Sequence, residues 1–296
     1  MTAGRLSGCG TALVTPFGDD GSVDERALRD LVEWQIAESI HFLVPCGSTG
    51  EAATMTPDEQ RRVVQIVVEQ TKGRVPVVAG AASNDTRKAI ELSKAVEAAG
   101  ATHLLHSSPM YNKPPQRGII AHFEAIARET SLPIVVYNVP GRTGSNIEAR
   151  TTLALAANER MVAVKEASGN LAQITDIFAG RPASFSVLSG DDEMTLAMMA
   201  LGADGIISVV SNAAPRLMAR LAQRALDGDF AGARELHFRL LPWMRAAFVE
   251  SNPLPAKAAL AMMGRIRNVL RLPLVPLDAA RTETVRAALQ QAGALD

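Results

Sequence analysis

A lysine interrupts an apolar run in the middle of the chain. Residues 161–166 read MVAVKE, so Lys165 would lie near the end of a buried strand. Burial disfavours the ammonium form and lowers the pKa of the amine, and a neutral amine can attack a carbonyl carbon to form a Schiff base. A strand-end lysine that extends its ammonium to solvent would give the same pattern. The residues around Lys165 must therefore decide between the two interpretations.

The chain has only two tyrosines, and both follow apolar runs of strand length. Tyr137 ends the run PIVVY, and Tyr111 follows the run that begins THLLH. A phenol can carry protons to and from a carbinolamine, and a hydroxyl such as that of Ser48 or Thr49 can pass them on. For either tyrosine alone, packing is an equally good interpretation.

Two glycine-containing segments offer groups that suit carboxylates. The turn 47–50, with sequence GSTG, exposes backbone N–H groups and two hydroxyls. Arg142 follows a Pro-Gly pair and could hold a second carboxylate through two hydrogen bonds. We interpret Glu51 and Glu166 as structural, and strand alternation should turn Glu166 out of the barrel.

Other chemistries find less support. His103 and His106 are three residues apart in a strand and should face opposite sides, so we predict no metal site. Neither a P-loop nor GxGxxG occurs, which leaves no visible place for a nucleotide cofactor. With 30 Lys and Arg against 31 Asp and Glu, we expect no nucleic-acid partner. Cys9 and Cys46 lie in apolar runs and should be buried thiols.

Eight short apolar runs recur through the first 212 residues, separated by amphipathic segments of helical length. One such segment, 57–71, opens with the capping box TPDE at 56–59. The regular alternation favours an α/β protein with a closed (β/α)8 TIM barrel over a doubly wound open sheet. The eight runs begin at Gly10, His41, Val75, Thr102, Pro133, Met161, Phe185 and Asp204.

Beyond residue 212 the pattern becomes helical, with helices predicted over 215–227, 230–249, 254–264 and 278–292. We expect a barrel domain over 1–228 and a C-terminal helical domain over 229–296. Active sites of such barrels form at the C-terminal ends of the strands, where the polar residues described above cluster. The first residues show no cationic cluster before a long apolar stretch, so we expect a cytoplasmic protein with no membrane partner.

The motifs together resemble the dihydrodipicolinate synthase family, within the pyruvate-dependent class I aldolases that include N-acetylneuraminate lyase. The arginine of YNVPGRTG indicates the synthase branch. The resemblance implies a lyase of lysine and diaminopimelate biosynthesis that condenses pyruvate with L-aspartate 4-semialdehyde and needs no external cofactor. It covers nearly the whole chain, and its motifs, in the family's order and spacing, are GTALVTPF, GSTGEAATM, YNVPGRTG, VAVKEASGN, LSGDD, GIISVVSN and NPLPAK.

The resemblance also implies catalytic roles. Lys165 would form the Schiff base with pyruvate, and Tyr137, Ser48 and Tyr111 would form a hydroxyl relay for proton transfer. Ser48 stands where the family commonly has threonine, which keeps the hydroxyl. In the family the tyrosine that matches Tyr111 enters the site of a neighbouring subunit. A homotetramer built as a dimer of dimers is therefore expected.

Binding roles follow in the same way. Thr49 would hold the pyruvate carboxylate and Arg142 that of the aldehyde, while the carbonyls of Gly190 and Ile207 would line the pocket. Two alternatives remain open at this point. One is another pyruvate-dependent aldolase or dehydratase that acts on a sugar acid or hydroxy-oxo acid. The other is a keto-acid sensor without turnover.

The sequence departs from the family in the pocket where lysine-sensitive members bind L-lysine. The family's tyrosine, histidines and glutamate are replaced by Met110, Pro57, Gln60 and Lys88. An L-lysine ammonium would lose an anionic partner there and meet the charge of Lys88. Feedback inhibition by L-lysine should therefore be weak or absent.

Overall fold

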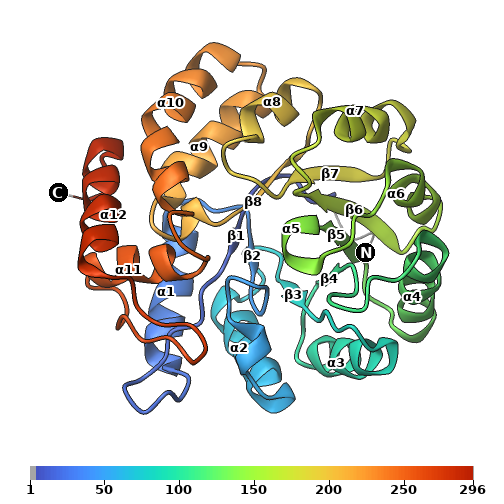
Figure 1. The fold of residues 1–296 in the computed structure, drawn as a ribbon, viewed down its shortest axis with the longest axis horizontal. Coiled ribbons are helices and arrows are strands. Elements are labelled where there is room, and N and C mark those ends of the chain that lie inside the picture. Colours follow the sequence, from blue (N-terminus) through green and yellow to red (C-terminus); the bar gives the residue numbers. More distant parts are fainter. Residues whose placement is uncertain (1–4, 296) are drawn as a thin grey trace.

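The eight predicted strands are present in the computed structural model, which describes residues 5–295. All are parallel, in the order β2-β1-β8-β7-β6-β5-β4-β3, and a bridge between Leu43 and Val77 brings β2 beside the start of β3. They surround a central axis, with helices outside them (Figure 1). The (β/α)8 prediction is confirmed. The strands are β1 (Gly8–Ala12), β2 (Phe42–Val44), β3 (Val78–Gly80), β4 (His103–Ser107), β5 (Ile134–Asn138), β6 (Met161–Glu166), β7 (Ser186–Ser189) and β8 (Gly205–Ser208).

The helices follow the strands in the predicted alternation. The capping box at the start of α2 is formed, because the Thr56 hydroxyl accepts from the Glu59 N–H and the Glu59 carboxylate accepts from the Thr56 N–H. The helical elements are α1 (Glu25–Ala37), η1 (Ala52–Thr54), α2 (Pro57–Thr71), α3 (Thr86–Ala98), α4 (Gln116–Glu129), α5 (Pro140–Thr143), α6 (Ala149–Ala156), α7 (Leu171–Gly180), α8 (Thr195–Ala200), η2 (Val210–Asn212), α9 (Pro215–Leu226), α10 (Phe230–Ala246), α11 (Leu254–Met262) and α12 (Ala279–Ala292).

Strand alternation divides the core into two layers. Val135 and Tyr137 of β5 belong to the apolar cluster inside the barrel, whereas Ile134 and Val136 belong to the cluster between strands and helices. Gly10 of β1 is needed in this interior, because a Cβ there would lie 2.0 Å from the Phe42 ring. Because all the strands are parallel, the inward-facing side chains near their C-terminal ends lie together at one mouth of the barrel.

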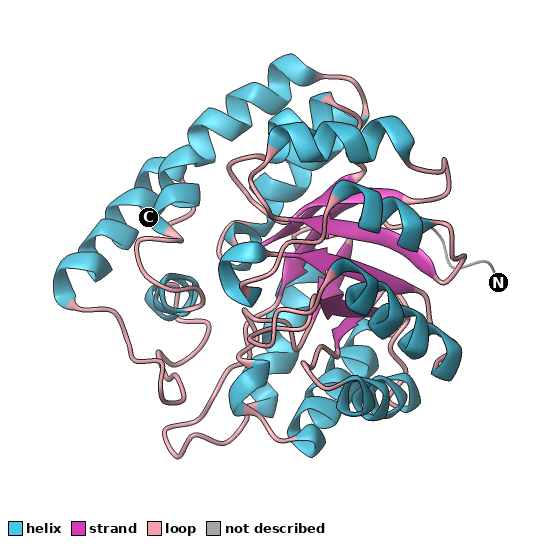
Figure 2. Ribbon diagram, turned by 45° about the vertical axis from the view of Figure 1, so that its right-hand side comes forward, coloured by secondary structure: helices cyan, strands magenta, loops and turns pink. Residues whose placement is uncertain are grey.

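The C-terminal helices lie on one side of the barrel (Figures 1 and 2). Helix α10 packs against α9 and α12, and Trp243 of α10 donates to the Val210 carbonyl at 3.1 Å. Leu240 and Val285 from this part belong to the same apolar cluster as the outer faces of the barrel strands. The division into domains at residue 228 stays a prediction. Within residues 5–295, no helix is both long enough and apolar enough to cross a bilayer.

Three buried histidines lie on β4 and α4. His103, His106 and His122 are 3 %, 0 % and 4 % exposed. Burial lowers the pKa of His103 and of His122 to about 4 and that of His106 to about 3. All three are therefore neutral in the folded protein near neutral pH. Within the described residues, no group of three or more His, Cys, Asp or Glu is placed to hold a metal ion.

These histidines predict a loss of stability in mild acid. Below the ordinary histidine pKa of 6.5 the unfolded chain takes up protons that the folded protein does not, so the free energy of unfolding falls as pH decreases. Each such histidine adds a slope of about 1.4 kcal/mol per pH unit between about pH 6 and its folded pKa. Denaturant unfolding at several pH values and fixed protein concentration measures this loss of stability. H106Q should lower the slope by about 1.4 kcal/mol per pH unit, the contribution of one proton. Parallel slopes for H106Q and wild type would contradict this account.

Candidate active site

A cavity of about 1170 Å³ opens at the C-terminal ends of the barrel strands. It is the place where polar residues from several strands converge, as expected for this architecture. Six of the eight predicted site residues line it: Ser48, Thr49, Tyr137, Arg142, Lys165 and Gly190.

Lys165 and Tyr137 lie beside each other in the wall of this cavity. They lie opposite each other on the adjacent strands β6 and β5, and Lys165 Nζ is 4.2 Å from the centroid of the Tyr137 ring. Burial lowers the pKa of Lys165 to about 7, with Asp192 raising it and Arg142 lowering it further. Burial raises the pKa of Tyr137 to about 12. Near neutral pH the site therefore contains a substantial fraction of neutral amine beside a protonated phenol.

Asp192 is a buried carboxylate whose charge acts on Lys165. It accepts hydrogen bonds from the Ser208 hydroxyl and from the Val209 and Val210 N–H groups, the N–H bond from Val209 being 3.0 Å long. Burial raises its pKa to about 6. Asp192 ends the motif LSGDD, but nothing local in the sequence indicates that its charge acts on Lys165.

Gly190 makes room for the lysine. A Cβ at this position would lie 3.1 Å from Lys165 Cε and 2.8 Å from the Ala167 Cβ. Contacts this short must displace one of the partners. The absence of a side chain at Gly190 therefore helps to fix where the amine lies.

We expect G190A to slow formation of any covalent adduct on Lys165 by about threefold or more, because Lys165 Cε, 3.1 Å from the added Cβ, must move by a few tenths of an ångström. Rapid-quench borohydride trapping measures that rate. G141A is the matched control, since a Cβ at Gly141 meets nothing within 4 Å. Equal rates in G190A and G141A would contradict the steric assignment.

Residues 47–51, called here the 47–51 turn, follow β2 and form one wall of the cavity. Its backbone is closed by the Gly50 N–H, which donates to the Gly47 carbonyl at 3.0 Å, and the Thr15 hydroxyl donates to the Gly50 carbonyl at 2.7 Å. Thr49 is 3 % exposed, and its hydroxyl accepts from Asn252 Nδ2 at 2.8 Å. The turn thus presents a fixed hydroxyl and backbone groups to the cavity.

Arg142 lies on the short helix α5 and lines the cavity. Its Nη2 donates to the Asn252 carbonyl at 3.2 Å. Asn252 therefore contacts two predicted binding residues, Thr49 through its side chain and Arg142 through its backbone. Asn252 opens the motif NPLPAK, but its role was not predicted because both contacts join segments more than one hundred residues apart.

The other two predicted site residues do not line the cavity. Tyr111 is 88 % exposed with a positive φ of 74°, and its N–H donates to the Thr143 carbonyl at 3.2 Å. Ile207 is fully buried in β8, within the apolar interior of the barrel. Glu166 faces outward, where it accepts from Asn138 Nδ2 and the Ser168 N–H. Cys46 lines the cavity as a buried free thiol.

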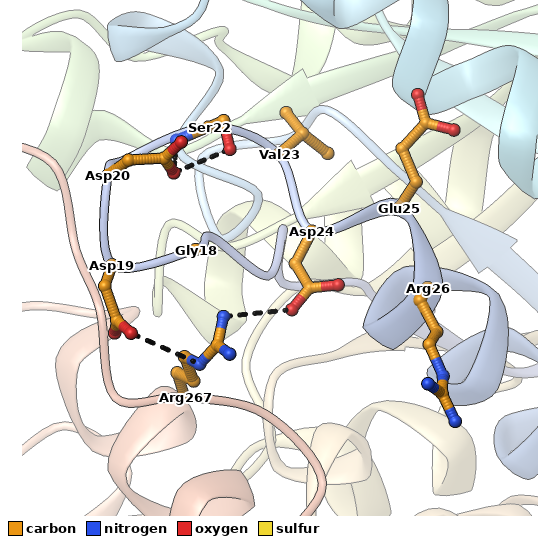
Figure 3. Close-up of a pocket in the computed structure, with 9 residues that line it drawn as sticks. All are labelled: Gly18, Asp19, Asp20, Ser22, Val23, Asp24, Glu25, Arg26 and Arg267. Atoms are coloured by element: carbon orange, nitrogen blue, oxygen red, sulfur yellow. Dashed lines mark hydrogen bonds and ion pairs between the residues drawn. The ribbon is translucent and has the colours of Figure 1, made fainter.

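A second hollow lies beside the start of α1 and carries several carboxylates (Figure 3). Arg267 lies between two carboxylates, with its Nε 3.6 Å from Asp19 Oδ2 and its Nη1 3.7 Å from Asp24 Oδ2. Asp24 also caps α1 by accepting from the Ala27 N–H, and Asp20 accepts from Ser22. These carboxylates already have structural partners, and the hollow lies apart from the lysine.

The fold and the cavity define a class of protein: a (β/α)8 barrel with a buried, partly neutral lysine at the barrel mouth, suited to Schiff-base chemistry. The chain belongs to the dihydrodipicolinate synthetase family, whose model matches residues 5–292. This confirms the family resemblance. Members of this family are lyases.

Individual relatives agree with this assignment. A 4-hydroxy-tetrahydrodipicolinate synthase of Koribacter versatilis is 52 % identical over 292 residues, which cover 98 % of this chain and 97 % of the relative. A chloride-inhibited dihydrodipicolinate synthase of Acinetobacter baumannii, solved in complex with pyruvate, is 40 % identical with a TM-score of 0.96 and covers 98 % and 100 % of the two chains. A dihydrodipicolinate synthase of Cyanidioschyzon merolae, solved with lysine bound, is 39 % identical with a TM-score of 0.95 and covers 98 % and 99 %.

Proposed function

We propose that this chain acts as a 4-hydroxy-tetrahydrodipicolinate synthase, which condenses pyruvate with L-aspartate 4-semialdehyde and uses no external cofactor. One observation carries the proposal: Lys165, with its pKa lowered to about 7 by burial, lies against Tyr137 in the cavity at the barrel mouth. The pyruvate complex of the Acinetobacter baumannii relative and the names of the relatives support the choice of substrates.

The first half of the reaction activates pyruvate. The neutral Lys165 amine adds to C2 of pyruvate, and loss of water from the carbinolamine leaves an imine. Tyr137 donates and recovers protons in this step, with Ser48 passing them on. The 47–51 turn holds the carboxylate, with the Thr49 hydroxyl as one donor. Loss of a proton from C3 then gives the enamine.

The second half forms the carbon–carbon bond. C3 of the enamine attacks the aldehyde carbon of L-aspartate 4-semialdehyde, and the new alkoxide takes a proton. Arg142 holds the carboxylate of the aldehyde substrate, and Gly190 lines the pocket, whereas Ile207 lies in the barrel interior below it. The amino group that came from L-aspartate 4-semialdehyde then attacks C2 of the imine and closes the ring. Expulsion of the Lys165 amine from C2 releases 4-hydroxy-tetrahydrodipicolinate.

Tyr111 belongs to this proposal as a residue supplied by a neighbouring subunit. Its 88 % exposure and its attachment to the α5 segment leave the phenol outside its own cavity. A second copy in a tight dimer would receive it, and two such dimers would form the homotetramer. The hydroxyl relay would then consist of Tyr137, Ser48 and the partner copy's tyrosine.

Borohydride reduction with and without pyruvate tests the proposal. Intact-mass and peptide mass spectrometry should locate a pyruvate-dependent adduct on Lys165, and turnover should require L-aspartate 4-semialdehyde. Absence of the adduct in folded protein would overturn the mechanism. An adduct with turnover of a sugar acid instead would overturn the choice of aldehyde.

L-Lysine is expected to inhibit this enzyme weakly or not at all. Gln60, Lys88 and Met110 line the cavity, so the ammonium of an added L-lysine that binds beside them meets the Lys88 charge. Initial rates at micromolar to millimolar L-lysine, with a lysine-sensitive family member as positive control, measure the effect. Half-inhibition at micromolar L-lysine would contradict the expectation.

A further inference from the structure

Glu51 and Lys257 form a buried ion pair behind the 47–51 turn, and the mechanism above makes no use of it. Both side chains are fully buried, and the Lys257 ammonium contacts the Glu51 carboxylate. Lys257 Nζ also donates to the Val269 carbonyl at 2.7 Å and lies 4.1 Å from the centroid of the Phe17 ring. Buried charges are costly unless paired, and an apolar pair of the same volume would pack as well. Packing alone therefore does not explain these two charges.

The pair joins the turn to the C-terminal helices. Glu51 has a left-handed backbone with φ of 55°, which residues other than glycine rarely adopt. Its N–H donates to the Ser48 carbonyl at 3.2 Å, so its position is coupled to the backbone of the turn. Its carboxylate is held by Lys257 of α11 and by the Arg271 N–H, at 3.2 Å. Fixing the Glu51 side chain therefore fixes the end of the turn.

A second contact reaches the turn from the same part of the chain. Asn252 is 5 % exposed, and its Nδ2 donates to the Thr49 hydroxyl. Because the Thr49 oxygen accepts this bond, its own hydrogen is free to donate into the cavity. Asn252 thus orients the hydroxyl that would meet a substrate carboxylate.

We infer that Glu51, Lys257 and Asn252 are positioning residues for the keto acid. The C-terminal part of the chain holds the 47–51 turn through these contacts, so that the Thr49 hydroxyl stays aimed at the pyruvate carboxylate. This inference rests on the proposed function, since it assigns the turn to pyruvate. Glu51 and Lys257 act on the turn and not on Arg142, so pyruvate binding should suffer more than aldehyde binding.

The test measures KM for each substrate in E51Q, K257M, E51Q/K257M and N252A. We expect KM for pyruvate to rise about tenfold in the Glu51 and Lys257 variants and about threefold in N252A, while KM for the aldehyde changes less than about threefold. The double variant removes both charges, so it should be more stable than either single variant, which leaves one buried charge unpaired. In E51Q the amide oxygen can still accept from the Arg271 N–H.

R181M is the matched control. It breaks the Arg181–Asp204 ion pair, whose side chains are 16 % and 11 % exposed, at the opposite end of β8 from the cavity. Both KM values should stay as in wild type in R181M. A folded double variant and a folded N252A with wild-type KM for pyruvate would overturn the inference, as would equal increases in both KM values. If wild type itself gives no borohydride-trapped pyruvate adduct, the proposed function falls, and the inference falls with it.

Discussion

Replacing Lys165 by alanine is expected to abolish the pyruvate adduct and to lower turnover by about a thousandfold or more, because the Schiff base requires the amine that lies beside Tyr137. Lys165 is 5 % exposed and its amine has a pKa of about 7, so it is the group able to react with a ketone near neutral pH. Borohydride trapping with intact-mass analysis, and a coupled assay of turnover, measure the two effects.

K165R separates charge from nucleophilicity. Arginine keeps a cation at the end of β6 but stays protonated, so it should be as inactive as alanine while retaining the fold. Circular dichroism and thermal unfolding check that the fold is intact. Turnover of K165A or K165R within tenfold of wild type would remove Lys165 from the chemistry.

Y137F is expected to lower kcat by about a hundredfold or more, in the range found for removal of a general acid–base group. The phenol is held protonated by burial, with its pKa raised to about 12, and its ring packs against the Lys165 amine. Phenylalanine keeps this packing and removes only the hydroxyl. The fall should therefore appear in kcat more than in KM for pyruvate.

Phe17 shows what the packing of a ring against a lysine amine contributes when no hydroxyl is present. Its ring also packs against a lysine amine, that of Lys257, and it has no hydroxyl to exchange protons. F17L should therefore lower thermal stability with little change in kcat. If Y137F retained the wild-type kcat, the tyrosine would be a wall of the pocket and not a proton carrier.

The barrel could be predicted from the sequence because the signals for its strands and helices recur regularly and each lies within a few consecutive residues. Each strand needed only a short apolar run, and helix α2 was marked by four residues, Thr56 to Glu59. The inward face of β6 followed from alternation, which placed Lys165 in the cavity and turned Glu166 outward. These predictions required no knowledge of contacts distant in the sequence.

The missed residues depend on such distant contacts. Asn252 meets Thr49 across 203 residues, and Lys257 meets Glu51 from the last part of the chain. A single sequence does not show which residues of a C-terminal helix contact which residues of a barrel loop. Glu51 was interpreted as structural, and nothing local in the sequence indicated Lys257 as its partner. Tyr111 is 88 % exposed, and its proposed place in the cavity of a second copy is likewise a contact that the sequence of one chain does not give.

The pairing of β1 with β8 sets the order in which this protein can be completed during synthesis. Gly8 to Thr11 of the first strand pair with residues 205–208, so the first strand lacks one neighbour until the eighth has left the ribosome. At ordinary rates of translation this takes roughly 10 to 40 s, during which an apolar strand edge stays open to other chains. Nascent chains stalled before β8 should therefore be the species that most need chaperones.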